Sequence, residues 1–322
     1  MQDLLTYLEA EQPKINEALD REVGELHPLV QATIKHVLSA GGKRLRPLLT
    51  MLTARCLGYG RDDIYPLACA LEFLHSATLL HDDILDGAEL RRGLPAAHTV
   101  FGSTQTILAG DALLALGNKI MARPGIPKLT ECISEAIMHT ATGEIAEIAH
   151  VRNAKLTEAQ YLDIITGKTA YLIQASCRVG AILGKANKER ERAAASFGLS
   201  LGIAFQLVDD ALDYASTSEA TGKPVGADIL EGKVTLPLLL YLRDMEGPER
   251  ETFTRQFEKK ILVASELSDI ADKVRQGGYA DQTRTKAKDY ADRARDSLLR
   301  LPDNKERKLL ETALDYVLTR DK

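Results

Sequence analysis

Apolar residues recur at helical spacing along almost the whole chain, and no segment shows the strict alternation that is typical of a strand. Ala and Leu dominate the long segments, which favours helix. We therefore predict an all-α protein. The predicted helices cover Glu9–Glu22, His27–Ala40, Leu45–Leu57, Asp63–Leu85, Thr106–Met121, Leu129–His150, Glu158–Leu183, Asn187–Tyr214 and Thr235–Asp244, with shorter helices over Arg250–Arg320.

Three breaks between the predicted helices combine glycines with basic residues. The first, Gly41 and Gly42, precedes a cluster of three cations. The second, Gly87–Ala97, contains two adjacent arginines, and the third, Thr217–Lys233, contains three glycines and two lysines. No break is long enough to separate two domains. We therefore predict a single domain over residues 1–322.

The composition narrows the class of protein. With 322 residues and 45% apolar content, the chain can bury a large core. A net charge of −5 argues against nucleic-acid binding, which needs a basic surface. The four cysteines lack a Cys-x-x-Cys pair, so we expect buried free thiols in a reducing compartment. No basic signal-peptide region and no charge-free membrane span are evident, which predicts a cytoplasmic protein without a transmembrane segment.

Two runs share the pattern Asp-Asp-x-x-Asp, and each ends a predicted apolar helix. On a helix, positions i, i+1 and i+4 lie near one face, so each run offers a patch of carboxylates that a cation must neutralise. Oxygen ligands favour Mg²⁺ over zinc. We predict that the runs form two walls of one metal site. Its candidate ligands are Asp82, Asp83, Asp86, Asp209, Asp210 and Asp213.

Basic residues stand close to both acidic runs in the sequence. Arg side chains can grip phosphate oxygens bidentately, and a lysine on an apolar helix needs an anionic partner. A substrate that carries both metal and diphosphate explains the two groups together. Gly-Gly-Lys-Arg lacks the P-loop pattern, which disfavours ATP chemistry. The basic candidates are Lys43, Arg44, Arg46, Arg91, Arg92, Lys168, Lys223 and Lys233.

Several motifs in this order resemble those of the all-trans polyprenyl diphosphate synthases, a branch of the isoprenoid synthase family. The resemblance rests on Gly-Gly-Lys-Arg-Leu-Arg-Pro (41–47), His-Asp-Asp-Ile-Leu-Asp (81–86), Arg-Arg-Gly (91–93), Gly-Lys-Thr (167–169), Phe-Gln-Leu-Val-Asp-Asp-Ala-Leu-Asp (205–213), Gly-Lys-Pro (222–224) and Gly-Lys-Val-Thr-Leu-Pro (232–237).

The resemblance implies a helical bundle around a deep central cavity, a homodimer, and head-to-tail condensation of isopentenyl diphosphate with an allylic diphosphate. It implies Mg²⁺ ligation by Asp82, Asp86 and Asp209, with the other three aspartates nearby. The allylic diphosphate would be held by Arg91, Lys168, Thr169, Gln206, Lys223 and Lys233, and isopentenyl diphosphate by Lys43, Arg46, His75 and Arg92.

One position departs from the pattern of the family. The helix before His150 normally carries Gln or Asp at the second position of an acidic pair, whereas this chain has Glu144 and Glu147. The extra charge leaves the contribution of Glu147 to Mg²⁺ binding open.

Small residues below Asp82 bear on the length of the product. Leu74, Ala77 and Thr78 continue the Asp82 face toward the start of their helix. Short-chain members of the family place aromatic rings at the positions of Ala77 and Thr78, so we expect a deep tunnel and a long-chain product. Ile133 or Ile137 is the expected floor.

Three alternatives stay open at this stage. One is a shorter farnesyl or geranylgeranyl product. Another is a class I terpene cyclase, which needs no isopentenyl diphosphate site and leaves Lys43, Arg46 and Arg92 unexplained. The last is a non-catalytic partner subunit, which has no use for six clustered carboxylates.

Overall fold

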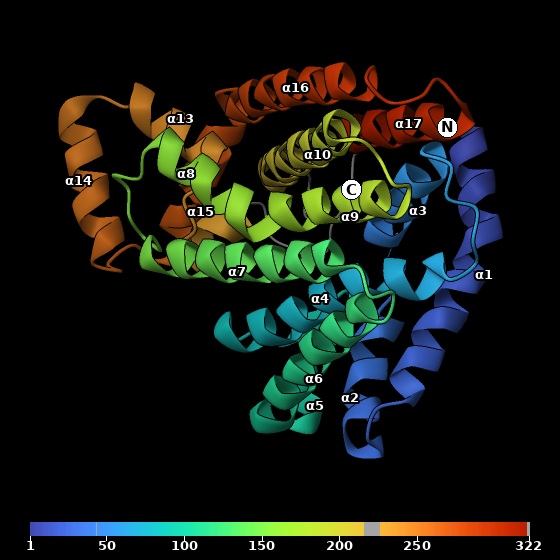
Figure 1. Ribbon diagram of the computed structural model, residues 1–322. Helices are drawn as coiled ribbons and strands as arrows, with labels where there is room; N and C mark the ends of the chain where they lie inside the picture. Colours follow the sequence, from blue (N-terminus) through green and yellow to red (C-terminus); the bar gives the residue numbers. More distant parts are fainter. Residues whose placement is uncertain (43, 216–225, 321–322) are drawn as a thin grey trace. The chain divides into compact units, whose positions relative to one another are not determined.

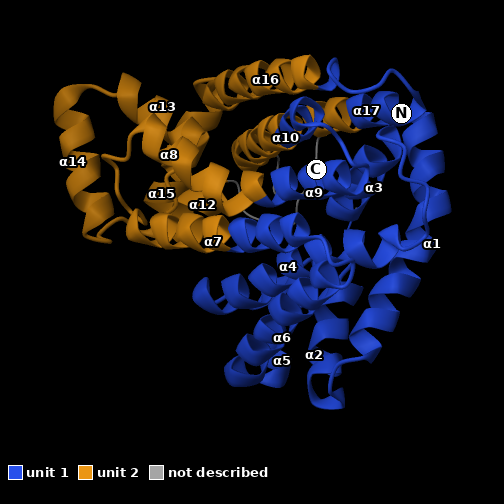
Figure 2. Cartoon of the chain, viewed as in Figure 1, with its two compact units in different colours: residues 1–137, 172–195, 298–312 blue, residues 138–171, 196–297, 313–322 orange. Residues whose placement is uncertain are grey.

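The computed structural model describes residues 1–42, 44–215 and 226–320 (Figure 1). The prediction of an all-α protein is confirmed, because one short hairpin is the only sheet in this part of the chain. The residues fall into two compact units, each assembled from separate segments (Figure 2). Unit 1 comprises Met1–Ile137, Leu172–Ala195 and Leu298–Thr312, and unit 2 comprises Met138–Tyr171, Ser196–Ser297 and Ala313–Lys322. The single domain over residues 1–322 stays a prediction.

Unit 1 is built mainly from the N-terminal helices. Its centre is α4, whose buried residues occur all around the helix rather than along one stripe, as expected of a helix enclosed by others. Figure 1 shows α4 beside α6, and α1, α2 and α3 also contact α4. The elements are α1 (Gln2–Gly24), α2 (Pro28–Ser39), α3 (Leu45–Cys56), α4 (Ile64–Leu85), β1 (Leu90–Arg91), β2 (Leu94–Pro95), α5 (Ala97–Phe101) and α6 (Ser103–Ala122).

Close packing of α4 against α6 depends on two glycines. A Cβ atom at Gly117 would lie 2.6 Å from Leu74 Cδ1, and one at Gly110 would lie 2.2 Å from the His81 ring. Real side chains do not approach so closely, so each glycine admits a side chain of α4 where α6 crosses it. The small residues therefore set how near the two helices come to each other.

The predicted loop between α4 and α6 has more structure than expected. Leu90 pairs with Pro95 and Arg91 with Leu94 in an antiparallel hairpin, and α5 follows. Two-residue strands are too short to show an alternating pattern, so periodicity could not predict them.

Unit 2 holds the second half of α7 (Pro127–Ala149) and most of α10 (Lys188–Ala215). Apolar residues from several distant segments, including Tyr161, Leu207 and Phe257, join in its core. The remaining elements are α8 (Glu158–Ile165), η1 (Thr166–Ala170), α12 (Ala227–Glu231), α13 (Leu236–Asp244), α14 (Gly247–Glu258), α15 (Ala264–Gln276) and α16 (Tyr279–Leu298). Helices α9 (Tyr171–Leu183) and α17 (Lys305–Thr319) each contribute residues to both units.

The predicted helix 158–183 is interrupted by the π-helical turn η1. Thr157 and Gln160 form a reciprocal capping box at the start of α8, as the sequence pattern suggests. At η1, a Cβ atom on Gly143 of α7 would lie 2.2 Å from the backbone nitrogen of Lys168. Gly143 and Gly167 thus let two backbones touch. A π-helical turn widens the helix by one residue, and such turns are frequent at functional sites.

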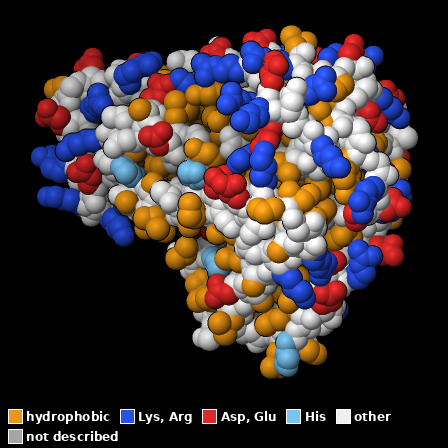
Figure 3. Space-filling model, viewed as in Figure 1, with side chains coloured by type: hydrophobic (Ala, Val, Ile, Leu, Met, Phe, Trp, Pro, Cys, Tyr) orange, Lys and Arg blue, Asp and Glu red, His pale blue; other side chains and the backbone are white. Residues whose placement is uncertain are grey.

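Cysteines and surface charges agree with the sequence analysis. All four cysteines are buried and unpaired to one another. Charged side chains of both signs are interspersed on the face shown in Figure 3. One described helix, α10, is long and apolar enough to cross a membrane, but 61% of its most apolar window is buried, as in the core helix of a globular protein.

Candidate active site

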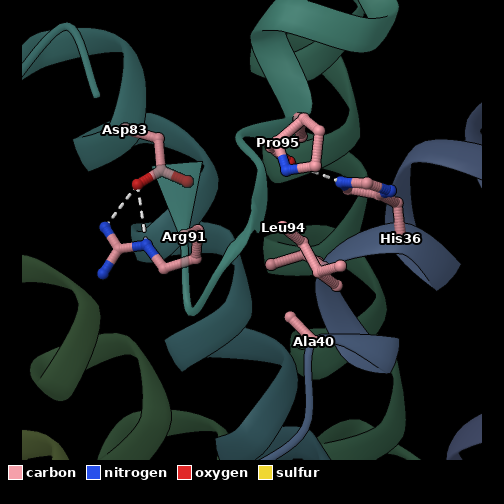
Figure 4. Close-up of a pocket in the computed structure, with 8 residues that line it drawn as sticks. His36, Ala40, Asp83, Arg91, Leu94 and Pro95 are labelled. Atoms are coloured by element: carbon pink, nitrogen blue, oxygen red, sulfur yellow. Dashed lines mark hydrogen bonds and ion pairs between the residues drawn. The ribbon is translucent and has the colours of Figure 1, made fainter. Parts of the chain in front are cut away.

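The first aspartate motif ends α4 in unit 1. Asp82 is half-buried and Asp86, the C-terminal cap, is exposed. Asp83 is buried, and its Oδ1 accepts a hydrogen bond of 2.8 Å from Arg91 Nε and a second from Arg91 Nη2 (Figure 4). The paired, enclosed Asp83 therefore anchors the hairpin to α4, whereas Asp82 and Asp86 lie nearer the surface.

The hairpin also brings the two basic segments of unit 1 together. Arg92 has a left-handed backbone (φ 52°), and its guanidinium donates to the carbonyl of Gly41. A Cβ atom at Gly42 would lie only 3.0 Å from Arg92 Nη1. The glycine pair thus leaves room for Arg92 to lie against the loop that precedes α3.

The pKa of His75 is affected by the positive charges of four arginines, Arg44, Arg46, Arg91 and Arg92. We call these five residues the basic cluster of unit 1. Burial, and then the positive charges led by Arg46, hold the pKa of His75 well below its usual range, so the imidazole is neutral at pH 7. Burial lowers the pKa of Arg46 to about 10, with Glu72 opposing and Arg92 reinforcing the shift. Such a concentration of positive charge suits a polyanion.

Arg46 also has a donor to offer. Its Nε is buried and has no hydrogen-bond partner among the described residues. A buried donor without a partner costs free energy, and an anionic ligand would satisfy it. The basic cluster therefore fits a diphosphate group.

Arg44 has a different role from its neighbours. Its guanidinium donates to Glu72 Oε1 (2.9 Å) and to the carbonyl of Leu38 (2.8 Å), and both charged side chains are buried. The backbone of Arg44 is left-handed (φ 48°). This ion pair fixes the N-terminal cap of α3, and Arg46 lies in the first turn of that helix.

The second aspartate motif lies near the end of α10 in unit 2. Asp209 is exposed, and its Oδ1 is 2.9 Å from Arg320 Nη2. The Arg320 guanidinium also lies over the Phe205 ring, 4.0 Å from its centroid, and donates to the Phe205 carbonyl (2.8 Å). Arg320 thus holds the first residue of the motif from outside α10.

Asp210 is enclosed by hydrogen-bond donors. Its Oδ2 accepts from the Tyr161 hydroxyl (2.6 Å) and its Oδ1 from Gln206 Nε2 (2.8 Å). Burial raises the pKa of Asp210 to about 7, although both donated hydrogen bonds act in the opposite direction. Gln206 Oε1 in turn accepts from Thr169 (2.9 Å), so two predicted substrate residues are joined to the acidic motif.

Asp213 caps the short helix α12. The backbone nitrogens of Ala227 and Asp228 donate to its two carboxylate oxygens, each at 3.1 Å. Burial and the charges of Asp213 and Asp210 raise the pKa of Asp228 well above its usual range. Asp228 therefore adds an acidic group to this end of α10 that the motif search did not select.

Lys168 lies in η1 between two carboxylates of α7. Its Nζ is 2.9 Å from Glu144 Oε2, and it also donates to Glu147 Oε2. The pair that departs from the family pattern thus holds a predicted substrate residue. An ammonium group leaves two carboxylates only for a more strongly charged partner, such as a diphosphate.

Most of the residues predicted to set product length lie in or against one buried apolar cluster of unit 1. Leu74, Ala77 and Ile133 are at most 2% exposed, and Ile137 packs against the cluster. Thr78 is half-buried and donates to the His75 carbonyl. Leu74 and Ile133 converge on Gly117, where a Cβ atom would meet both. Leu74 and Ile133 therefore lie together at Gly117, and their role in setting product length stays a prediction.

Lys43 and Lys223 lie outside the described residues. Lys233 is 2.7 Å from Glu231. No group of three or more His, Cys, Asp or Glu side chains among the described residues is arranged to hold a metal ion. The complete assignment of site residues therefore stays a prediction.

Sequence reasoning did not select several residues that support the motifs. Arg320 follows the last helix, and Tyr161 lies in an ordinary amphipathic pattern, so neither stands out along the chain. Glu72 offered the one available signal, since a carboxylate in an otherwise apolar helix needs a partner.

Comparison with known proteins tests the resemblance. The sequence profile of the family described as polyprenyl synthetase matches residues 27–273. Octaprenyl diphosphate synthase of Escherichia coli (strain K12) is 34% identical over 308 residues, which cover 96% of this chain and 95% of that enzyme. Geranylfarnesyl diphosphate synthase of Aeropyrum pernix is 37% identical over 307 residues, which cover 89% of this chain and 93% of that enzyme.

A solved structure extends the comparison to three dimensions. Polyprenyl synthase from Caulobacter crescentus CB15, complexed with calcium and isoprenyl diphosphate, superposes with a TM-score of 0.93 at 37% identity. The match covers 99% of this chain and 97% of that one. The fold is thus that of the all-α isoprenoid synthases. The chain belongs to the polyprenyl synthetase family and is a prenyltransferase.

Proposed function

We propose that the chain condenses isopentenyl diphosphate head-to-tail with an allylic diphosphate and makes a long-chain, all-trans polyprenyl diphosphate. The observation that carries the proposal is the basic cluster of unit 1, which lies beside the first aspartate motif and retains a buried donor on Arg46 without a described partner. A terpene cyclase has no isopentenyl diphosphate for this cluster to bind.

The aspartates suit Mg²⁺ in their chemistry. Asp82, Asp86 and Asp209 offer oxygen ligands that are half-buried or exposed at the ends of two helices. We assign these three as ligands. Asp83, Asp210 and Asp213 orient the motifs through the bonds already described. Calcium in the Caulobacter crescentus enzyme supports a divalent metal here. When bound, Mg²⁺ neutralises charge on the departing diphosphate.

The remaining residues bind and orient the two substrates. Arg46, His75 and Arg92, with Lys43, hold isopentenyl diphosphate. Lys168, Thr169 and Gln206, with Arg91, Lys223 and Lys233, hold the allylic diphosphate. Lys168 exchanges Glu144 and Glu147 for that diphosphate. Apolar residues keep water from the allylic cation, and separate anchoring of two diphosphates brings the reacting carbons together.

The proposal of a long-chain product is supported by the small side chain of Ala77 on α4 and by relatives of this chain. Octaprenyl diphosphate synthase is similar over nearly the whole chain, although geranylfarnesyl diphosphate synthase is as well. We also propose a cytoplasmic homodimer, which size-exclusion chromatography and cell fractionation would test.

Chromatography of products made from labelled isopentenyl diphosphate and several allylic primers tests the function. We expect polyprenyl diphosphates longer than geranylgeranyl diphosphate, formed only with Mg²⁺ present. Hydrocarbon formed from the allylic substrate alone would indicate a cyclase. A product that stops at farnesyl or geranylgeranyl diphosphate would contradict the long-chain proposal.

A further inference from the structure

We propose that Tyr161 is a positioning residue for the allylic half of the reaction. It orients the Asp210 carboxylate and, through Gln206, the Thr169 hydroxyl. This inference rests on the proposed function, which assigns Thr169 and Gln206 to the allylic diphosphate.

The donors and acceptors of this chain run in one direction. The Tyr161 hydroxyl donates to the Asp210 carboxylate (2.6 Å), which in its ionised form can only accept. Gln206 donates its amide to the other carboxylate oxygen (2.8 Å), which leaves its Oε1 to accept from Thr169 (2.9 Å). The Thr169 hydroxyl donates to Gln206 Oε1 here, so Gln206 sets the position from which this hydroxyl can turn its hydrogen toward an incoming diphosphate.

Three elements are tied together by these bonds. Tyr161 is on α8, Asp210 and Gln206 are one helical turn apart on α10, and Thr169 is on η1. Tyr161 is 2% exposed, and the capping box fixes the start of its helix. The phenol is thus a rigid reference point against which the side chains of α10 are aligned.

Removing the hydroxyl has a specific consequence. Asp210 is 4% exposed, so water does not readily replace the lost donor. Its carboxylate is then held on one side only, and Gln206 loses a fixed acceptor. Partners that orient ligand-binding groups typically contribute about 10- to 100-fold to metal affinity or activity.

Unit 1 offers a matched control. The buried Tyr65 hydroxyl donates to the Glu11 carboxylate (2.8 Å), which is the same kind of bond at the opposite end of α4 from Asp82. Tyr161→Phe and Tyr65→Phe each remove a buried hydroxyl that donates to a carboxylate, and the Tyr65 hydroxyl also accepts from Arg55 (3.2 Å). They differ in whether the carboxylate belongs to an acidic motif.

The experiment measures kcat, the KM for each diphosphate and the half-saturating Mg²⁺ concentration of wild type and both variants. For Tyr161→Phe we expect kcat/KM for the allylic substrate to fall about 10- to 100-fold and more Mg²⁺ to be required, while the KM for isopentenyl diphosphate changes less than about twofold. Tyr65→Phe should lower the melting temperature but leave kcat, both KM values and the Mg²⁺ requirement unchanged.

A double-mutant cycle adds a second test. If Tyr161 acts through Thr169, the effect of Tyr161→Phe on allylic kcat/KM should be smaller in a Thr169→Val background than in wild type. If the two fold-changes simply multiply in the double variant, Tyr161 and Thr169 act independently. That result would overturn the proposal that Tyr161 orients Thr169.

The outcomes separate the two proposals. A wild type that makes no polyprenyl product with any primer contradicts the proposed function. An active wild type with Tyr161→Phe constants unchanged, or with both KM values raised equally, contradicts this inference alone. If a melting curve shows Tyr161→Phe to be unfolded, Asp210→Asn weakens the same bond from the other side, and the same selective loss is expected. Unchanged constants in Asp210→Asn would overturn the inference.

Discussion

At the scale of single residues, partners decide the role of each charged side chain. Arg44 and Arg46 are two positions apart, yet their guanidinium groups differ. Arg44 is paired with Glu72, whereas Arg46 has a buried Nε with no described partner. Charge alone does not distinguish a structural arginine from one that binds an anion. The distinction depends on whether the guanidinium donors are buried and whether they have hydrogen-bond partners.

Arg46 should act mainly on one substrate. We expect Arg46→Ala to raise the KM for isopentenyl diphosphate about 10- to 100-fold, the effect of losing charge-assisted hydrogen bonds, and to leave the allylic KM within about twofold. Steady-state kinetics with each substrate varied in turn would show this. Arg178→Ala is the control, because Arg178 pairs with Glu135 and Glu191 in the same unit. A selective rise in the allylic KM would mean that the two pockets are assigned in reverse.

His75 should make stability depend on pH. Its pKa is depressed in the folded protein, so below pH of about 6.5 the unfolded chain binds a proton that the native state does not. The free energy of unfolding should therefore fall as pH decreases from 6.5, by up to about 1.4 kcal/mol per pH unit from this group.

Urea unfolding at several pH values would measure that slope. His75→Asn should make it shallower. His27→Asn is the control, since His27 is exposed and Asn can replace it as the N-terminal cap of α2. Equal slopes in wild type and His75→Asn would contradict the prediction.

At the scale of elements, glycines determine how closely the backbones of two helices can approach each other. Gly143 brings α7 against η1 and so places Glu144 and Glu147 beside Lys168. The arrangement of charges depends on a residue that has no side chain.

Gly143→Ala should therefore be costly. The new Cβ would meet the Lys168 backbone, and overpacking of this kind destabilises proteins by about 1–3 kcal/mol. We expect a lower melting temperature together with weaker allylic binding. Gly24→Ala, where nothing lies within 4 Å, should have little effect on either measurement. A Gly143→Ala variant as stable as wild type would show that α7 can move away without cost.

The α4 helix offers a test of product length. Ala77→Phe places a ring in the buried cluster below Asp82, and we expect shorter products with the first condensation preserved. Ala68→Phe is the control, because Ala68 is equally buried but lies on the opposite side of α4. Chromatography and melting curves of both variants would separate tunnel blocking from overpacking. A stable Ala77→Phe variant that still makes the full-length product would contradict the proposed tunnel.

At the scale of the whole molecule, the two aspartate motifs belong to different units. Asp82→Ala and Asp209→Ala should each reduce kcat at least about 100-fold, because each removes a proposed ligand that stabilises charge in the transition state. Because both act on one reaction, the double variant should be less impaired than the product of the single effects. Single-turnover assays over a range of Mg²⁺ concentrations would measure this, and near-wild-type turnover in either single variant would contradict it.

Periodicity predicted most of the long helices, because the helical repeat of apolar residues is a local signal. Helix α4 begins one residue after its predicted start and ends where predicted. The division of helix 158–183 by η1 was not predictable, since it depends on contact with Gly143, a residue distant in sequence. For the same reason, motif spacing indicated the acidic and basic candidates but gave no sign of Tyr161 or Arg320.

The segments of the two units alternate along the chain, and this has a consequence for synthesis on the ribosome. Leu298–Thr312 completes unit 1, and unit 2 still requires Ala313–Lys322. Neither unit has all its segments until nearly the entire chain has been translated. The Asp209 carboxylate and the Phe205 ring of α10 must therefore wait for Arg320, which is made almost last, and chaperones that shield nascent chains should bind this protein until late in its translation.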